Sequence, residues 1–375
     1  MTRLRVALDV LPLAGARTGV GRFCAGLAGA LAVREDLELR AYAIARRARS
    51  EVAVPAAALG LGLRTWAVQA RVANALWARV ELPPVEWLVG RVEVVHGTNY
   101  VVPPASHAGR VVTVHDLTAV RYPQMCVPAS LAYPHLVSRA ARRGAFVHVP
   151  SSFVRDEVVE LLGLDAERVR VVPHGLDEPG RGDLDEAPRG RSAPYVLALG
   201  AVEPRKDLPT LVMAFAELAR DHDDLELVVA GPDGWGGEAF SAAVRASGLA
   251  GRVVRVGYLD ELELKSLLSG ATVLAYPSLY EGFGFPPLEA MAAGVPVVAT
   301  AAGAVPEVVG DAAELVVPGD VPALAEALTR VIEDDSLRAR LIAAGRARAA
   351  SFTWASAAAS MVELYREAAL WGRSR

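Results

Sequence analysis

The pattern of apolar and polar positions predicts a chain in which β-strands alternate with α-helices. Short runs that are apolar throughout, without polar alternation, indicate strands buried on both faces, and such strands are typical of parallel sheets covered by helices. The expected strands are Leu4–Val10, Leu37–Ala43, Val92–His96, Arg110–His115, Phe146–Val149, Val169–Val172, Tyr195–Leu199, Leu225–Ala230, Val253–Val256, Thr272–Tyr276, Val295–Ala299 and Ala313–Val316.

Helices are expected between these strands, where apolar residues recur with helical spacing. Ser151 or Ser152 is placed to cap one of them, since a serine oxygen can accept a hydrogen bond from the first turn. The alanine-rich segment Ala56–Arg79 is expected to be helical as well. The other expected helices are residues 20–32, 129–143, 321–333, 336–350 and 354–371.

One segment lacks this periodicity and predicts the domain organisation. Residues 173–194 are rich in Pro, Gly and acidic residues, as is typical of a connection between domains. We therefore expect a first domain at residues 1–172, the connection at 173–194, a second domain at 195–353, and a last helix in 354–375.

Composition narrows the class of protein. No run near 18 residues is free of charge, and the apolar start contains Asp9, so we expect neither a membrane span nor a signal peptide. Cys24 and Cys126 are too few for a disulfide framework or a metal cluster, and a cytoplasmic location is expected.

The charge is uneven along the chain. Residues 1–172 carry 21 Arg and 14 Asp plus Glu, a net +7, whereas the rest carries 18 Lys plus Arg and 29 Asp plus Glu, a net −11. Arginine clusters at 46–49 and 139–143 favour weak contact with an anionic membrane surface, at the inner face of the membrane. Solvated helix faces would give the same pattern.

The stretch from Glu281 to Pro296, EGFGFPPLEAMAAGVP, predicts a ligand site. It follows an expected strand, and ligands of parallel sheets bind at the carboxyl ends of strands. Gly282 and Gly284 allow backbone N–H groups to approach a ligand, and the following helix start suits phosphate. Glu281 and Glu289 could each accept hydrogen bonds from a polyhydroxylated ligand. A solvated pair of acids is the simpler alternative.

A second stretch, GAVEPRKDLPTLVMAF, follows the strand Tyr195–Leu199 and predicts a diphosphate site. Gly200 gives a turn, and Arg205 and Lys206 stand together at a helix start. Lysine is rare in this chain: of 39 Lys plus Arg, only Lys206 and Lys265 are lysines. A solvated pair at a helix end is the alternative.

Other candidates follow the remaining strands. Gly231 and the pair Tyr258–Leu259 would line the base side of a nucleotide, unless they form ordinary turns. His96 is expected to be hydrogen-bonded within a loop, whereas His115, followed by Asp116, is expected to serve a site. The loop Gly15–Gly21 lacks the third glycine of a dinucleotide fingerprint, which argues against a nicotinamide site.

These motifs resemble the E-x7-E region and the E-P-R-K-D/N stretch of retaining glycosyltransferases of family 4. The resemblance covers most of the second half and, more loosely, the first. It implies the GT-B fold, with two Rossmann-like doubly wound parallel-sheet domains facing a central cleft and a C-terminal helix that crosses back to the first domain. Departures are Phe285 for an aliphatic residue, Ala201 for an arginine after the glycine, and His174 for asparagine in V-P-N-G-V-D.

The resemblance also implies roles. Glu281 would contact the donor sugar and Glu289 the ribose, while Arg205 and Lys206 would hold the pyrophosphate and His115 would approach the sugar. The remaining donor-binding candidates are Gly19, Gly21, Gly200, Gly231, Tyr258, Leu259, Gly282, Phe283 and Gly284.

The function implied is transfer of a mannose- or glucose-type sugar from a nucleoside-diphosphate sugar to an acceptor hydroxyl, with retention, in polysaccharide, glycolipid or glycan assembly. No metal and no other cofactor are expected, the acceptor would be a glycan or a lipid-linked molecule, and no nucleic acid is involved. Two alternatives are a nucleotide-sugar epimerase of the same fold and a non-catalytic nucleotide-sugar-binding subunit.

Overall fold

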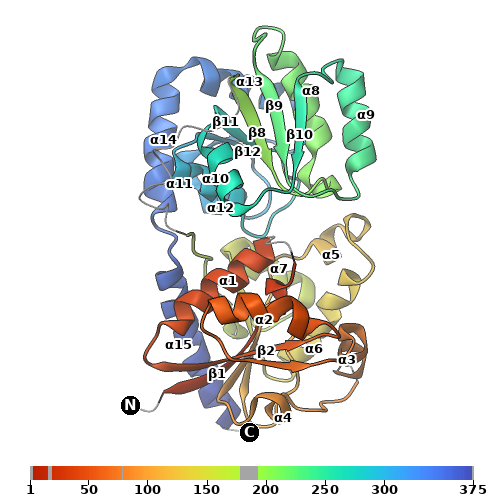
Figure 1. Cartoon of the computed structure of the whole chain (residues 1–375), viewed down its shortest axis with the longest axis vertical. Helices are drawn as coiled ribbons and strands as arrows, with labels where there is room; N and C mark the ends of the chain where they lie inside the picture. Colours follow the sequence, from red (N-terminus) through yellow and green to blue (C-terminus); the bar gives the residue numbers. More distant parts are fainter. Residues whose placement is uncertain (1–2, 16–18, 78, 178–192, 374–375) are drawn as a thin grey trace. The chain divides into compact units, whose positions relative to one another are not determined.

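The structure, a computed structural model, describes residues 3–15, 19–77, 79–177 and 193–373 (Figure 1). The chain divides into two compact units. Unit 1 comprises Met1–Asp177 together with Phe352–Arg375, and unit 2 comprises Glu178–Ser351. Most of the expected connection, residues 178–192, lies outside the described residues.

Unit 1 contains a seven-stranded sheet in the order β3-β2-β1-β4-β5-β6-β7, in which the neighbouring strands are parallel. Its central strands bury both faces, as their continuous apolar runs predict. The strands are β1 (Leu4–Asp9), β2 (Leu37–Ile44), β3 (Leu63–Trp66), β4 (Val94–Gly97), β5 (Gly109–Thr113), β6 (Phe146–Val149) and β7 (Val169–Val171).

Helices on both faces cover this sheet (Figure 1). The last helix of the chain, α15, packs against β5 and α1 of unit 1, which confirms the predicted return of this helix to the first domain. The α-helices of unit 1 are α1 (Gly19–Ala32), α2 (Ala48–Ala58), α3 (Ala70–Trp77), α4 (Glu86–Val89), α5 (Thr118–Arg121), α6 (Tyr133–Arg142), α7 (Ser152–Leu162) and α15 (Trp354–Arg373). Short 3-10 turns are η1 (Leu11–Leu13), η2 (Pro123–Met125), η3 (Ser130–Ala132) and η4 (Ala166–Arg168).

The expectation that Ala56–Arg79 is helical throughout is wrong. The structure divides this segment into the end of α2, the strand β3 and the helix α3. β3 (LRTW) is an edge strand with partly buried side chains, so its own pattern is weak. Pairing with β2, from Ala41↔Leu63 to Ile44↔Trp66, supplies the hydrogen bonds that its sequence does not indicate.

Unit 2 contains a six-stranded sheet in the order β10-β9-β8-β11-β12-β13, with neighbouring strands again parallel. The strands are β8 (Tyr195–Leu199), β9 (Glu226–Ala230), β10 (Val253–Gly257), β11 (Val273–Tyr276), β12 (Val297–Thr300) and β13 (Glu314–Val316). The helical segments are η5 (Pro204–Lys206), α8 (Leu208–Leu218), α9 (Gly237–Ser247), α10 (Glu261–Ser269), α11 (Phe285–Ala293), α12 (Val305–Val309), η6 (Gly310–Ala312), α13 (Val321–Glu333) and α14 (Asp335–Ala349). The two parallel sheets confirm the predicted fold class.

Local sequence signals fix the ends of several helices. Ser151 accepts a hydrogen bond from the N–H of Val154 and caps α7. Pro286 and Pro287 lie in the first turn of α11, where the N–H that proline lacks is not needed, and Gly294 ends this helix in the left-handed conformation (φ 77°). The sequence therefore predicts α11 closely.

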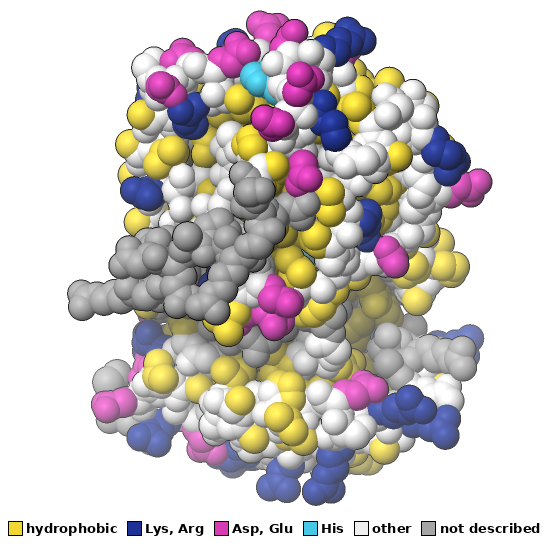
Figure 2. Space-filling view, turned by 45° about the horizontal axis from the view of Figure 1, so that its top comes forward, with side chains coloured by type: hydrophobic (Ala, Val, Ile, Leu, Met, Phe, Trp, Pro, Cys, Tyr) yellow, Lys and Arg dark blue, Asp and Glu magenta, His cyan; other side chains and the backbone are white. Residues whose placement is uncertain are grey.

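The uneven charge follows the two units. Unit 1 carries 24 Arg and 17 Asp plus Glu, a net +7, and unit 2 carries 15 Lys plus Arg and 26 Asp plus Glu, a net −11. On the face in Figure 2, arginine side chains gather along the lower edge of unit 1, and many acidic side chains gather at the upper end of unit 2. Within the described residues, no helix is long and apolar enough to cross a membrane.

Candidate active site

The loops after β8 and β11 meet at the point where the strand order of unit 2 reverses. β8 is followed in sequence by its neighbour β9 on one side, whereas β11 lies on its other side. In doubly wound sheets, ligands bind at the carboxyl ends of the two strands that flank such a reversal. The stretches that the sequence marks as ligand sites are the ones that follow these two strands.

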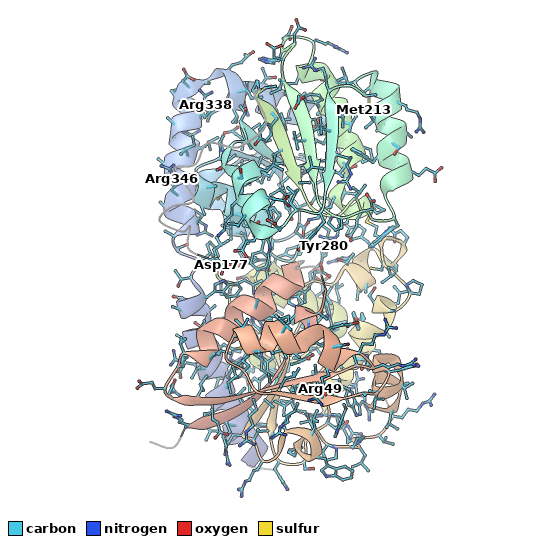
Figure 3. The ribbon with its side chains drawn as sticks, viewed as in Figure 1. Arg49, Asp177, Met213, Tyr280, Arg338 and Arg346 are labelled. Atoms are coloured by element: carbon cyan, nitrogen blue, oxygen red, sulfur yellow. The ribbon has the colours of Figure 1, made fainter. Side chains whose placement is uncertain are left out.

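Direct hydrogen bonds hold the two loops together. The N–H of Leu279 donates to the carbonyl oxygen of Arg205 (2.8 Å), and Arg205 Nη1 donates to the carbonyl oxygen of Tyr280 (3.0 Å). Tyr280 is labelled in Figure 3 at the lower edge of unit 2, where these loops lie. Arg205 therefore has a fixed position relative to the residues that precede Glu281.

The structure brings Arg205, Lys206 and Glu281 into one cation–carboxylate cluster. Glu281 Oε2 lies 2.6 Å from Arg205 Nη1, and Glu281 Oε1 lies 2.6 Å from Lys206 Nζ. The three side chains are mostly buried, with 18%, 12% and 9% of their surfaces exposed. Glu203 extends the cluster, with its carboxylate 3.8 Å from Arg205.

The protonation of the cluster follows from these contacts. Burial would raise the pKa of the Glu281 carboxyl, but the charges of Arg205 and Lys206 outweigh burial and lower that pKa to about 2. Burial lowers the pKa of Lys206 below its ordinary value, and Glu281 opposes that change. Glu281 is thus ionised at neutral pH and contacts both cations directly. Arg205 and Lys206 are the groups of the cluster that could bind an anionic ligand.

Two glycines permit the close backbone contacts around the cluster. Gly231 has φ +139°, and a Cβ added there would lie 2.1 Å from the carbonyl oxygen of Gly200. Gly303 has φ +59°, and a Cβ there would lie 2.2 Å from the carbonyl oxygen of Glu281. This carbonyl also accepts a hydrogen bond from the N–H of Ala304 (2.8 Å), so the loop after β12 holds the backbone of Glu281.

Sequence reasoning missed Gly303 and Ala304. Both follow β12 at its carboxyl end, and the same rule that selects the loops after β8 and β11 would have selected them.

The other donor-binding candidates of unit 2 occupy three neighbouring loops and one helix. Gly282, Phe283 and Gly284 lead directly into α11, and Glu289 lies within that helix, where it is partly buried. The N–H of Gly231 donates to the carbonyl oxygen of Gly257 (2.7 Å), which places the ends of β9 and β10 together. Tyr258 and Leu259 follow β10, and the Tyr258 side chain is half exposed.

The remaining candidates belong to unit 1. Gly19 opens α1 and Gly21 lies in its first turn, while residues 16–18 of the expected loop lie outside the described residues. His115 was expected to be the last residue of its strand, but β5 ends at Thr113, two residues earlier. His115 Nε2 donates to the carbonyl oxygen of Thr98 (2.9 Å). Phe23 of α1 stacks edge-on against His115, with ring centroids 5.2 Å apart. Burial lowers the pKa of His115 to about 4, so its ring is neutral.

His96 lies inside strand β4, not in a loop, and belongs to a buried hydrogen-bonded chain. His148 Nε2–H must donate to the carbonyl oxygen of Val172 (2.9 Å), which leaves Nδ1 to accept from the Thr113 hydroxyl (2.9 Å). Thr113 therefore accepts from His96 Nε2–H (2.7 Å), and His96 Nδ1 accepts from the Tyr365 hydroxyl (2.7 Å). This His–Thr–His chain therefore uses both ring nitrogens of His96 in hydrogen bonds within the protein, which makes the role of His96 structural. The expectation that His96 is hydrogen-bonded is correct, although the residue lies in a strand and not in a loop.

With this geometry established, comparison with known proteins identifies the family. The model of "Glycosyltransferase Family 4" matches residues 17–178, and that of "Glycosyl transferases group 1" matches residues 185–348. The O-antigen chain mannosyltransferase B of Escherichia coli is 30% identical over 284 residues, which are 72% of this chain and 73% of that protein. The MMP alpha-(1->4)-mannosyltransferase of Mycolicibacterium hassiacum is 34% identical over 243 residues, 63% of this chain and 57% of that protein.

Solved structures agree on the fold. The sucrose-phosphate synthase of Thermosynechococcus elongatus superimposes with a TM-score of 0.73 at 22% identity, covering 97% of this chain and 99% of that chain. Anabaena HepE in complex with UDP-glucose superimposes with a TM-score of 0.75 at 18% identity, covering 97% and 100%. The chain belongs to the glycosyltransferases of family 4 and is a glycosyltransferase of the GT-B fold.

Proposed function

We propose that this glycosyltransferase takes a sugar from a nucleoside-diphosphate sugar and transfers it to an acceptor hydroxyl with retention of the anomeric configuration. The observation that carries the proposal is the cation–carboxylate cluster at the strand reversal of unit 2, where Arg205 and Lys206 flank one carboxylate. Cleavage of the anomeric bond places negative charge on the leaving diphosphate. Fixed cations in a largely buried site stabilise such charge as it develops.

Each cluster residue has a proposed part in this reaction. Arg205 and Lys206 bind the diphosphate and supply the positive charge that a metal ion would otherwise supply. Glu281 holds hydroxyls of the sugar. Glu289 on α11 binds the ribose, and the glycine-bearing loop before α11 offers backbone N–H groups to the donor. The departing phosphate takes the proton of the acceptor hydroxyl, so no side chain is assigned as a base.

His115 is proposed to approach the sugar as a neutral hydrogen-bonding group. Its Nε2–H is used by Thr98, so Nδ1 is the nitrogen that can accept a hydrogen bond from a sugar hydroxyl. Because the pKa of this ring is lowered, His115 is neutral at neutral pH and is not assigned as a proton donor. It positions the ligand.

A mannose- or glucose-type sugar is proposed. Mannose is favoured by the names of the two curated relatives, and glucose by HepE, whose structure holds UDP-glucose. A thermal-shift screen with GDP-mannose, UDP-glucose, dTDP-glucose and ADP-glucose identifies the donor, because a ligand that binds the native state raises the melting temperature. NMR of the product then gives the anomeric configuration. Inversion, or conversion of the donor without an acceptor, would overturn the proposal.

We propose that unit 1 contacts an anionic membrane surface and receives a glycan or lipid-linked acceptor there. Helix α3 buries Ala73 and Trp77 but exposes Val72 and Leu76, so it has an unburied apolar stripe. This stripe continues to Val80, which is also exposed. Exposed apolar side chains next to arginines suit the boundary between lipid headgroups and acyl chains.

Arginines lie beside this stripe. Arg139 Nε donates to the carbonyl oxygen of Trp77 (2.8 Å), which places the end of α6 next to the end of α3. Arg142 and Arg143, at that end of α6, are exposed to solvent. The cluster at 46–49 contributes further exposed arginines near α2, among them Arg49, which Figure 3 labels.

A further inference from the structure

Tyr276 contacts the Lys206 ammonium from beneath the site. It is the last residue of β11, and the residue is 2% exposed. Lys206 Nζ donates to the Tyr276 hydroxyl (3.0 Å) and lies 4.6 Å from the ring centroid, so the hydroxyl is the closer contact. β11 pairs with β8 on one side and with β12 on the other, so Tyr276 lies at the carboxyl end of a central strand.

The hydrogen bonds of Lys206 show what this contact achieves. An ammonium group has three N–H donors. One is directed to Glu281 (2.6 Å) and one to Tyr276, and within the part of the chain that the structure describes no third acceptor is within hydrogen-bond distance of Nζ. Two fixed partners orient the ammonium and leave one N–H for a ligand.

We propose that Tyr276 is a positioning residue, which holds the Lys206 ammonium in place so that its third N–H binds the diphosphate of the donor. This inference rests on the proposed function. Glu281 does not suffice as the sole anchor of Lys206, because its carboxylate is also assigned to the hydroxyls of the sugar. The Tyr276 hydroxyl contacts no part of the donor in this assignment and remains as an anchor.

The chemistry of a buried phenol suits this role. Burial, together with the charge of Glu281, raises the pKa of Tyr276 well above its ordinary value, so the hydroxyl stays neutral. It therefore accepts a hydrogen bond from Lys206 without adding a negative charge to those of Glu281 and Glu203, which would repel a diphosphate. A carboxylate at this position would neutralise the cations that the ligand needs.

The scarcity of lysine makes the proposal directly measurable. Lys206 and Lys265 are the only lysines of the chain, so protein labelled with [13Cε]-lysine gives two ε-methylene NMR signals. Lys265 pairs with Glu261 on the surface of α10 and serves as an internal reference. In the wild type, inorganic pyrophosphate is expected to shift the Lys206 signal and leave the Lys265 signal in place.

Tyr276→Phe keeps the ring and removes the hydroxyl. Its matched control is Tyr195→Phe, because Tyr195 is also buried in this sheet but donates to the carbonyl oxygen of Leu267 (2.6 Å) at the start of β8. In Tyr276→Phe, Lys206 is expected to titrate at lower pH than in the wild type, since its charged form loses an acceptor while Glu281, Arg205 and Glu203 remain around it.

Turnover by Tyr276→Phe is expected to fall about tenfold, which is the size of one hydrogen bond to a charged group. Affinity for pyrophosphate is expected to fall with it, whereas Tyr195→Phe leaves both unchanged. In a Lys206→Ala background, Tyr276→Phe should cost no further turnover, because the two side chains act through one contact.

The inference is overturned if Tyr276→Phe leaves the Lys206 titration and turnover as in the wild type, or if both phenylalanine variants lose turnover equally. If Tyr276→Phe does not fold, nuclear Overhauser effects between the Lys206 ε-methylene and the Tyr276 ring in the wild type decide the matter, and their absence overturns the contact. A wild-type Lys206 signal that ignores pyrophosphate would instead reject the proposed diphosphate site.

Discussion

His96 Nδ1 lies 2.7 Å from the hydroxyl of Tyr365, although the two residues are 269 positions apart in sequence. The contact joins β4 to α15, and the His–Thr–His chain carries it on across β5 and β6 to the carbonyl oxygen of Val172. Each member has one fixed direction of donation, so loss of one hydroxyl leaves a buried acceptor without its donor.

Tyr365→Phe is expected to lower the free energy of unfolding by about 1–3 kcal/mol, because the buried Nδ1 of His96 then lacks a donor. Denaturation in urea measures the change. Tyr258→Phe is the control, since this side chain is half exposed and its loss of a hydroxyl should cost less than about 0.5 kcal/mol. If the two variants lose equal amounts of unfolding free energy, the hydrogen-bonded chain through His96 contributes no more stability than an exposed tyrosine hydroxyl.

Stability is expected to fall in acid because unit 1 keeps histidines buried and neutral. Burial lowers the pKa of His115 to about 4 and that of His148 to about 3, and it lowers those of His96 and His174 well below their ordinary value. The unfolded chain binds protons at these rings below pH 6.5 or so, while the folded chain does not. The free energy of unfolding should therefore be level above about pH 7 and decline as the pH falls from about 6.5 towards 4.

Urea titrations at several pH values test this expectation. His107→Gln is the control, because His107 is exposed and is not one of the buried rings. A stability that stays constant between pH 7 and pH 5 would contradict neutral burial of these rings.

Lys206→Ala is expected to reduce turnover about a hundredfold or more, the typical effect of losing one charged group that stabilises a transition state. The melting temperature should change little, because Glu281 keeps Arg205 as a partner. Lys265→Ala is the matched control, since it removes the other lysine from a surface pair. Assays with and without a chelator test the reaction, and full activity of Lys206→Ala after chelation would reject the site as drawn.

The two glutamates should separate in binding experiments. Glu281→Gln removes the charge between Arg205 and Lys206, so a nucleoside diphosphate without its sugar should bind at least as tightly as to the wild type, while kcat falls because the sugar is misplaced. Glu289→Gln should weaken binding of the nucleoside diphosphate and raise the KM for the donor, with little change in kcat. Calorimetric titration of both variants with the nucleoside diphosphate measures this difference. If only Glu281→Gln binds it more weakly, the assignment of Glu281 to the sugar and Glu289 to the ribose is wrong.

Association with membranes should need both charge and the apolar stripe. The wild type is expected to sediment with anionic vesicles at low salt and to be released at high salt, because salt screens exposed charges. A variant with Val72→Ser and Leu76→Ser should bind less, and Val317→Ser, on the exposed surface of unit 2, is the control. If equal amounts of protein stay in the supernatant with neutral and with anionic vesicles, the membrane proposal is wrong and the arginines are simply solvated.

Most of the fold could be predicted because buried parallel strands are apolar throughout, and every expected strand appears with its ends shifted by at most two residues. β3 was missed because an edge strand takes its hydrogen bonds from a neighbour. The loops that supply Arg205, Lys206 and Glu281 were predicted from glycines and charges after strands. Their mutual contacts, and the support from Tyr276 and Gly303, were not, because tertiary pairs at such sequence separation leave no local pattern.

The return of α15 to unit 1 also sets the order in which the chain can fold as it leaves the ribosome. Nascent domains generally fold from the N-terminus onwards. Here Glu178–Ser351 precedes Phe352–Arg375 in the chain, so unit 1 cannot close before the whole of unit 2 has been synthesised. Until Tyr365 has been synthesised, His96 Nδ1 lacks the hydroxyl that donates to it, and β5 lacks the helix α15 that packs against it. The unit that begins the chain thus needs the last residues of the chain to close, and a chain that ends before residue 352 would lack the helix that packs against β5.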